Sequence, residues 1–329
     1  DLVDAGIEYT VLDDFHFKAA GLADSELTGH FVTEDDGRVM SVFPGSERLR
    51  YLIPFGSPEQ IVEHLGQIAE HHPGAVVVFG DDGEKFGSWP ETHKHVYGDR
   101  WLERFFDALT DHRDWIHTTT LADAVDNVAP AGKIYLPDCS YREMTEWALP
   151  AARQIDFEEL SREIGDNPHW PALRQFVRGG FWRNFKIRYP ESDEMYSRMM
   201  HVSRRLAQTA DMAERGESVD WSLLDAARAE LYRGQCNCAY WHGAFGGIYL
   251  PHLRNAIYEH LISAENLLNR ANRRPESWIE SNIDDFNCDS YPEIHLANDR
   301  LAMWIAPNAG GQIYELDVRP IRHNLLATL

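Results

Sequence analysis

Short apolar runs alternate with helical patterns along the first 138 residues. Ile7–Leu12 predicts a strand that ends in polar residues, and Pro58–His71 predicts a helix because its apolar residues recur at helical spacing. Ala75–Phe79 is a continuous apolar run followed by polar residues, as in a strand buried on both faces of a parallel sheet. Strands that alternate with helices predict an α/β fold. Further predicted elements are a helix at Asp99–Leu109 and short strands at Trp115–Thr118 and Lys133–Leu136.

The pattern changes twice after residue 138. Residues 139–274 contain no strand pattern, and their longest helical pattern, Ser192–Arg215, begins with acidic residues and is followed by Gly216. Residues 275–329 contain short segments bounded by turns. We therefore predict an α/β part at 1–138, a helical domain at 139–274 and an incomplete β-sandwich at 275–329. The other predicted elements are helices at Trp221–Arg233 and Leu253–Ala271 and strands at Ser277–Ile283, Glu293–Ala297, Arg300–Ala306 and Gly311–Asp317.

The composition restricts the partners of the chain. Lys and Arg number 31 and Asp and Glu 53, so the formal net charge is −22. Such a charge repels phosphate backbones and anionic lipids, which argues against nucleic-acid and membrane partners. No apolar run approaches the roughly 20 residues that span a bilayer. Four scattered cysteines are too few for a disulfide framework, so we expect reduced thiols in a cytoplasmic protein.

The densest polar cluster directly follows the apolar run Ala75–Phe79 and covers residues 80–90, GDDGEKFGSWP. In α/β folds the loops after the carboxyl ends of the strands carry the catalytic groups. Asp82 and Glu84 supply carboxylates, Lys85 supplies a cation, and Trp89 offers a flat face that suits a sugar ring. The alternative is a solvated acidic turn without a function.

Two further clusters are candidates for the same site. Asp13, Asp14 and His16 follow the first predicted strand, and strand ends of one parallel sheet share a face, although an Asp-Asp turn is more often a helix cap or a surface loop. The segment 235–247, QCNCAYWHGAFGG, combines aromatic residues, amides and glycines with Trp241 and His242. It suits the wall of a carbohydrate site, whereas His242 alone would more often be structural. The sequence contains no nucleotide-binding, zinc-protease or serine-hydrolase motif, and we predict neither a cofactor nor a metal.

At these clusters the sequence closely resembles glycoside hydrolase family 57, in its branch of 4-α-glucanotransferases and α-amylases. The resemblance rests on LDDFHFKAAGL at 12–22, GDDGEKFGSWPETHKHVY at 80–97, NFKIRYPESDEMYSRM at 184–199 and YRGQCNCAYWHGAFGGIYLPHLR at 232–254. It runs along essentially the whole chain. Family members combine a (β/α)7 barrel, a helical domain and a C-terminal β-sandwich, so the resemblance implies part of such a barrel at 1–138 and an α-glucan or maltooligosaccharide as substrate. Whether the protein forms a homo-oligomer stays an open question.

The resemblance also implies roles for single residues. The family retains anomeric configuration through a glutamate nucleophile and an aspartate acid/base in an Asp-x-Glu-x-Phe-Gly motif, which here falls on residues 82–87 and makes Asp82, rather than Asp81, the acid/base. In such a pair one carboxyl is protonated and gives its proton to the leaving glycosidic oxygen. The other is ionised, lies about 5–5.5 Å from the first, and forms the glycosyl-enzyme intermediate. The other matched positions imply substrate contacts, without showing which member of the first cluster touches sugar. They are Asp13, Asp14, His16, Glu84, Lys85, Trp89, Trp241 and His242.

One departure concerns the nucleophile. In the family, the nucleophile glutamate precedes a stretch that matches the first residues of this chain, and Glu8 lies inside the predicted strand without matching the nucleophile motif. We therefore expect the nucleophile upstream of residue 1, and expect residues 1–329 to be inactive alone.

Three functions stay open at this point. The first is a retaining enzyme that acts on α-1,4-glucans, with transfer between maltooligosaccharides preferred over hydrolysis of starch. The second is a non-catalytic glucan-binding module that stacks sugars on Trp89, Tyr240, Trp241 and Phe245. The third is a metal-dependent barrel similar to polysaccharide deacetylases, which would need Asp13, Asp14 and His16 as ligands.

Overall fold

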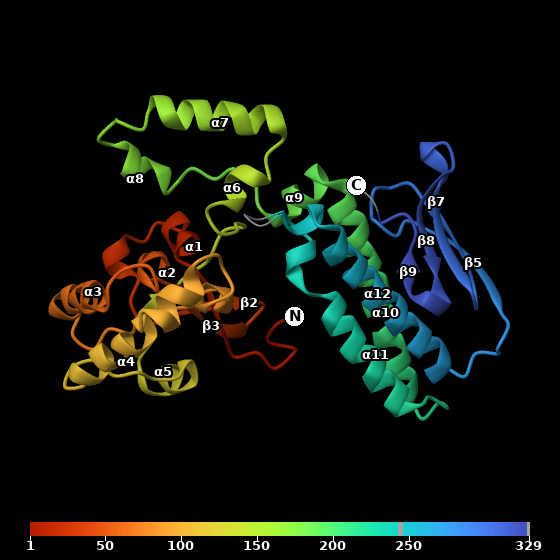
Figure 1. Ribbon diagram of the computed structural model, residues 1–329, viewed down its shortest axis with the longest axis horizontal. Coiled ribbons are helices and arrows are strands. Elements are labelled where there is room, and N and C mark those ends of the chain that lie inside the picture. Colours follow the sequence, from red (N-terminus) through yellow and green to blue (C-terminus); the bar gives the residue numbers. More distant parts are fainter. Residues whose placement is uncertain (243–245, 328–329) are drawn as a thin grey trace. The chain divides into compact units, whose positions relative to one another are not determined.

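The computed structural model describes residues 1–242 and 246–327 and forms two compact units, Asp1–Asn184 and Phe185–Leu329 (Figure 1). Each unit has its own sheet and its own apolar core, and the division falls inside helix α9 (Trp182–Arg188). No described helix has both the length and the apolar character needed to cross a membrane.

The first unit contains a mixed four-stranded sheet of order β1-β3-β2-β4. β1 (Tyr9–Asp13) and β3 (Arg38–Gly45) run parallel, with Asp13 opposite Gly45. β2 (Phe31–Asp35) pairs antiparallel with β3, and the short β4 (Gly132–Lys133) runs parallel to β2. The sheet is therefore not all-parallel, because the hairpin β2–β3 reverses the chain inside it.

Eight α-helices of the described residues, α1–α8, lie wholly in this unit. The first two follow the parallel strands directly, and each is capped by a side chain: Asp13 accepts a hydrogen bond from Phe15 N at 3.0 Å, and Ser46 accepts one from Leu49 N at 3.2 Å. Helix α3 has a capping box between Ser57 and Gln60. The eight are α1 (Asp14–Ala19), α2 (Glu47–Leu52), α3 (Pro58–His71), α4 (Trp101–Asp111), α5 (Leu121–Asn127), α6 (Met144–Trp147), α7 (Ala151–Glu163) and the short α8 (Trp170–Arg174).

The apolar run Ala75–Phe79 is not the buried strand that its composition predicts. It is extended but belongs to no strand, and only Val78 forms a bridge, parallel to Gly45. Val76 O accepts from Gly29 N and Val78 O accepts from Ser46 N, both at 2.8 Å, so these two hydrogen bonds go to different segments. Side-chain packing places this run beside β3 without a continuous ladder, and Phe79 is 37% exposed.

Two other predicted strands are also corrected. Trp115–Thr118 contains no strand, and only Lys133 of the segment Lys133–Leu136 is in one. The hairpin β2–β3 was missed, although Asp36 and Gly37 at its turn both have positive φ (50° and 75°), and Asp-Gly is a strong hairpin signal.

The second unit begins with three long helices that pack against one another (Figure 1). They are α10 (Pro190–Glu214), α11 (Trp221–Gly234) and α12 (Pro251–Ala271). Met195, Met199, Val202 and Leu206 line one face of α10 and are buried, as their spacing predicts.

A five-stranded sheet of order β5-β6-β7-β8-β9 follows. Every adjacent pair is antiparallel, and the sheet buries Trp304 and Ala302. The strands are β5 (Ile279–Asp284), β6 (Glu293–Asn298), β7 (Leu301–Ala306), β8 (Gln312–Val318) and β9 (His323–Asn324). The α/β class, the helical region and the C-terminal antiparallel strands predicted from the sequence are thus confirmed, whereas domain boundaries at 138 and 274 stay a prediction.

Candidate active site

Three chain segments meet at one edge of the first unit's sheet. Asp13 is the last residue of β1, and it lies opposite Gly45, the last residue of β3. Gly45 in turn bridges Val78, which precedes the loop Gly80–Trp89. The register therefore places the carboxyl ends of β1 and β3 and the start of the acidic loop side by side, as expected for a site in an α/β fold.

A network of paired charges crosses this edge. Arg50 of α2 donates from Nη1 to Asp13 Oδ2 at 3.1 Å, and its Nε lies 3.8 Å from Asp81 Oδ1. Lys85 Nζ forms an ion pair with Asp81 Oδ2 and donates to the Arg50 carbonyl at 2.8 Å. The side chains of Asp81 and Lys85 are only 2% and 5% exposed. Asp81 is thus a buried, compensated carboxylate that holds the loop to α2.

Asp82 differs from its neighbour in exposure and in partners. Its backbone N–H donates to Asp81 Oδ1 at 2.8 Å, but within the described residues its exposed carboxyl has neither a hydrogen bond nor an ion pair. Partial burial raises the pKa of Asp82, and the charges of Asp81 and Glu84 add to this rise, whereas Lys85 and Arg50 oppose it. A carboxyl in this position can hold a proton to higher pH than an ordinary aspartate and deliver it to a ligand in solvent.

An aromatic pair lies beside these carboxylates. The rings of Phe55 and Trp89 stack with centroids 6.3 Å apart and planes 19° apart, and Lys85 Nζ lies 5.7 and 5.5 Å from the two centroids. Gly87, at φ 129°, makes the turn that precedes Trp89, and a Cβ there would lie 3.1 Å from the Tyr97 ring. Phe55 is exposed and Trp89 partly exposed, and sugar rings bind to such aromatic faces through their C–H surfaces.

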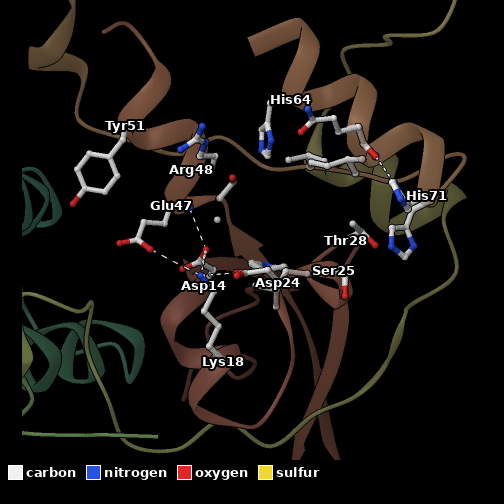
Figure 2. Close-up of a pocket in the computed structure, with 18 residues that line it drawn as sticks. Asp14, Lys18, Asp24, Ser25, Thr28, Glu47, Arg48, Tyr51, His64 and His71 are labelled. Carbon is white, nitrogen blue, oxygen red and sulfur yellow. Dashed lines mark hydrogen bonds and ion pairs between the residues drawn. The ribbon is translucent and has the colours of Figure 1, made fainter. Parts of the chain in front are cut away.

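Asp14 and His16 do not point to the same place as Asp13. Asp14 is buried against Lys18 (3.1 Å) and the backbone N–H of Glu47 (3.2 Å), and lines a cavity beside α2 and α3 (Figure 2). Burial raises the pKa of Asp14. His16 is bracketed by two carbonyl oxygens, those of Asp13 at 3.1 Å and Cys139 at 3.2 Å. The cluster predicted from the sequence therefore does not form one site. Asp13 belongs to the ion-pair network, Asp14 lines the cavity, and His16 links the end of β1 to Cys139.

Trp241 and His242 belong to the second unit. The His242 ring stacks on Tyr249 at 6.2 Å and contacts Phe185 and Tyr189 at 5.3 and 5.5 Å. Trp241 O accepts a hydrogen bond from Ile248 N at 2.8 Å. Residue 247 must be glycine here, because a Cβ at this position would lie 1.9 Å from Trp241 O. Both residues thus sit in an aromatic loop inside their own unit. Phe245 lies outside the described residues.

Sequence reasoning missed two parts of this site, Arg50 and Phe55. Both lie in or just after α2, where no run of polar residues marks them. Only the structure shows that the helix after β3 faces the acidic loop. Among the described residues no group of three or more His, Cys, Asp or Glu side chains is arranged to hold a metal ion.

Three family models match the chain. The model for glycosyl hydrolase family 57 covers residues 2–137, and models for the middle and C-terminal domains of α-amylase/4-α-glucanotransferase cover 180–268 and 285–329. The chain belongs to glycoside hydrolase family 57. The family-57 match covers the acidic loop, and the middle-domain match covers the aromatic loop at Trp241.

Known family-57 proteins resemble the chain along nearly all of its length. The α-amylase 1 of Dictyoglomus thermophilum is 40% identical over 328 residues, which are 100% of this chain and 46% of the relative. The 4-α-glucanotransferase of Thermococcus litoralis is 42% identical over 315 residues, 96% of this chain and 44% of the relative. The crystal structure of a T. litoralis 4-α-glucanotransferase matches with a TM-score of 0.82 and 41% identity, over 99% of this chain and 47% of that one. The chain thus spans less than half the length of the relatives it matches.

Proposed function

We propose that the natural protein containing this chain acts on α-1,4-glucans with retention of configuration, and that Asp82 is its acid/base. The observation that carries this proposal is the contrast between two adjacent aspartates. Asp81 is buried and paired with Lys85, whereas Asp82 is exposed, has no partner among the described residues, and has a raised pKa. A retaining glycosidase needs a carboxyl that is protonated at the first step and ionised at the second, which a compensated carboxylate such as Asp81 cannot supply.

The surroundings of Asp82 support a sugar as the ligand. Trp89 and Phe55 supply aromatic faces, and the Lys85 ammonium fixes the loop that carries them. Glu84 is exposed beside Asp82 and has room to accept a hydrogen bond from a sugar hydroxyl. Asp13, at the end of β1, accepts a hydrogen bond from Arg50, and we propose that it positions Arg50 beside the acidic loop. Trp241 and His242, from the middle domain, stay proposed substrate contacts on the strength of the family motif.

We prefer transfer of glucan segments between maltooligosaccharides to hydrolysis. Relatives of both names are about equally similar, at 42% identity for a 4-α-glucanotransferase and 40% for an α-amylase, so the printed names support either reaction. The reactions differ in whether a sugar hydroxyl or water attacks the glycosyl intermediate. The cytoplasmic location predicted from the sequence and assembly into a homo-oligomer also stay proposals.

Product analysis tests this function directly. The natural protein that contains this chain is incubated with maltotriose, and the products are separated by length. Glucose together with maltooligosaccharides longer than maltotriose indicates transfer, and only shorter sugars indicate hydrolysis. If neither maltotriose nor longer maltooligosaccharides are changed, the result would contradict the proposed enzyme activity and favour the glucan-binding module.

A further inference from the structure

A cavity of about 890 Å³ lies beside the site just described, between α1, α2 and α3 of the first unit. This volume is in the range of ligand sites in proteins. Figure 2 shows Asp14, Lys18 and Asp24 on one side of the cavity, with Arg48 and His64 across from them. Asp82, Lys85 and Trp89 are not among its lining residues, so the cavity is separate from the acidic loop.

Tyr51 is the aromatic wall of this cavity, and its ring is held in place. Its hydroxyl donates to Glu143 Oε1 at 3.1 Å and accepts from Arg142 Nη2 at 3.5 Å, while the residue as a whole is 51% exposed. The guanidinium of Arg50 lies 5.9 Å from the ring centroid. Because Arg50 also contacts Asp13 and Asp81, Tyr51 forms the boundary between the cavity and the candidate active site.

The acidic side chains of the cavity already have cationic partners. Lys18 Nζ lies 3.1 Å from Asp14 and 2.8 Å from Asp24, and Arg142 lies 3.1 Å from Glu47. Asp14 is 6% exposed, and its Oδ1 accepts no hydrogen bond from the described residues. That oxygen is itself buried, so the acidic wall presents compensated charges to the cavity, which favours a neutral ligand.

The opposite wall supplies both donors and acceptors. His64 is half-buried, and burial together with the charge of Arg48 lowers its pKa, so that the imidazole is neutral at pH 7 and presents one donor and one acceptor. Gln67, on the same helix as His64, adds an amide, and Ile68 and Val77 add apolar surface. Ser25 and Thr28, which lie beside Asp24, add hydroxyl groups to the cavity (Figure 2). Sugar hydroxyls both donate and accept, and sugar C–H faces need an apolar or aromatic surface.

We propose that this cavity is an additional binding site for a neutral α-glucan, with a glucose ring on Tyr51 and a sugar hydroxyl hydrogen-bonded to His64. The choice of an α-glucan as ligand rests on the proposed function, whereas the site itself requires no catalysis. Because Tyr51 borders both places, a maltooligosaccharide long enough to pass it reaches from the acidic loop into the cavity.

The test measures binding of maltoheptaose to the 329-residue chain by calorimetry and by the NMR signal of the His64 ring, which a His64→Gln variant assigns. Maltoheptaose is expected to shift this signal. Tyr51→Ala, and Ser25→Trp at an exposed position of the wall, should each weaken binding about tenfold, as removal or blockage of a central contact does. Tyr51→Phe keeps the ring and should stay within about twofold; circular dichroism checks that each variant is folded.

Three results would overturn the site. One is a His64 signal that does not move at saturating maltoheptaose, and another is the absence of binding to the chain. The third is displacement by millimolar inorganic phosphate, which would make Arg48 and His64 an anion site. Loss of binding in Trp89→Ala but not in Tyr51→Ala would refute the cavity site and leave the proposed function intact. If the natural protein binds maltoheptaose at the cavity but turns over no maltotriose, the proposed function is refuted and the cavity site remains.

Discussion

Two clusters of acidic and basic side chains, one in each unit, differ in how completely their charges are buried and paired. In the first unit, Asp13, Arg50, Asp81 and Lys85 form a chain of ion pairs beside the exposed Asp82, whose carboxyl has no partner among the described residues. In the second unit, Arg198 is fully buried between α10, α12 and the sheet and contacts three carboxylates. They are Glu265 at 2.6 Å, Glu315 at 2.7 Å and Asp317 at 3.3 Å.

The cluster around Arg198, which we call the buried cluster, is balanced in formal charge. Arg205 and Arg319 also contact Glu265, at 2.7 and 3.4 Å, so three guanidiniums face three carboxylates. The indole of Trp304 covers Arg198, with 4.3 Å between the guanidinium carbon and the ring centroid. The three carboxylates and the Arg198 guanidinium are at most 2% exposed, and we assign the cluster to holding the sheet on the helices rather than to chemistry.

The comparison shows what marks a reactive carboxyl in this protein. A high density of charged residues is not sufficient, since the buried cluster has more of them than the acidic loop. What distinguishes Asp82 is a paired network that fixes its position and leaves its own carboxyl free. A ligand can reach that carboxyl, and the network prevents the loop from moving away.

The largest effect is expected from breaking the buried cluster with Arg198→Met. This change leaves Glu265, Glu315 and Asp317 buried with too few cations, so the free energy of unfolding should fall by about 3–5 kcal/mol. Urea unfolding followed by circular dichroism measures it. Arg204→Met, at an exposed position of the same helix, is the control and should change it by less than about 0.5 kcal/mol. Equal effects would show that Arg198 is not a structural anchor.

A smaller effect is expected from Glu194, a carboxyl of the second unit without a cationic partner among the described residues. Burial raises its pKa to about 7, and the charges of Glu191, Asp193 and Glu293 add to the rise. Because the folded state holds this proton more tightly than the unfolded state, stability is greatest below the ordinary pKa of 4.5 and decreases as pH rises to about 7. The decrease should amount to at most about 3 kcal/mol.

The variant Glu194→Gln carries no titrating group at this position. Urea unfolding at pH 5 and pH 7 should therefore show a smaller loss of stability with rising pH than in the unchanged chain. The same pH dependence in both proteins would assign the proton uptake to another group.

The smallest effect is expected from Arg50→Met in the first unit. Arg50 is partly exposed, so the loss of stability should be within about 1 kcal/mol, far below that of Arg198→Met. Its charge lowers the pKa of Asp82, so its removal should raise that pKa further and move the alkaline limb of the pH–rate profile upward, by less than about one unit. An alkaline limb that moves downward would mean that another group holds the catalytic proton.

Several elements could be predicted from the sequence because their signals are local. The helix α3 begins and ends as predicted, since Ser57, Pro58 and Gln60 form its cap and its apolar face is periodic. The acidic loop was predicted as the densest polar cluster after an apolar run. The hairpin β2–β3 was missed although its Asp-Gly turn is an equally local signal.

Other features depend on contacts between distant segments. Whether Ala75–Phe79 forms a strand depends on its neighbours, and composition alone does not show that only Val78 pairs with β3. The family motif already favours Asp82 over Asp81, but only the positions of Arg50 and Lys85 in the structure show that the Asp81 side chain is buried and paired. The buried cluster was not found, because Arg198, Glu265 and Glu315 are more than 40 residues apart.

The most direct test of this account is the turnover of maltotriose by the natural protein that contains this chain, carrying Asp82→Asn. We expect turnover to fall by about 10²–10⁴-fold, the contribution of a general acid/base, while maltooligosaccharide affinity stays within several-fold. Asp126→Asn, at an exposed position of α5, is the matched control and should leave turnover unchanged. Turnover in Asp82→Asn equal to that of the unchanged protein would show that another carboxyl is the acid/base and contradict the account.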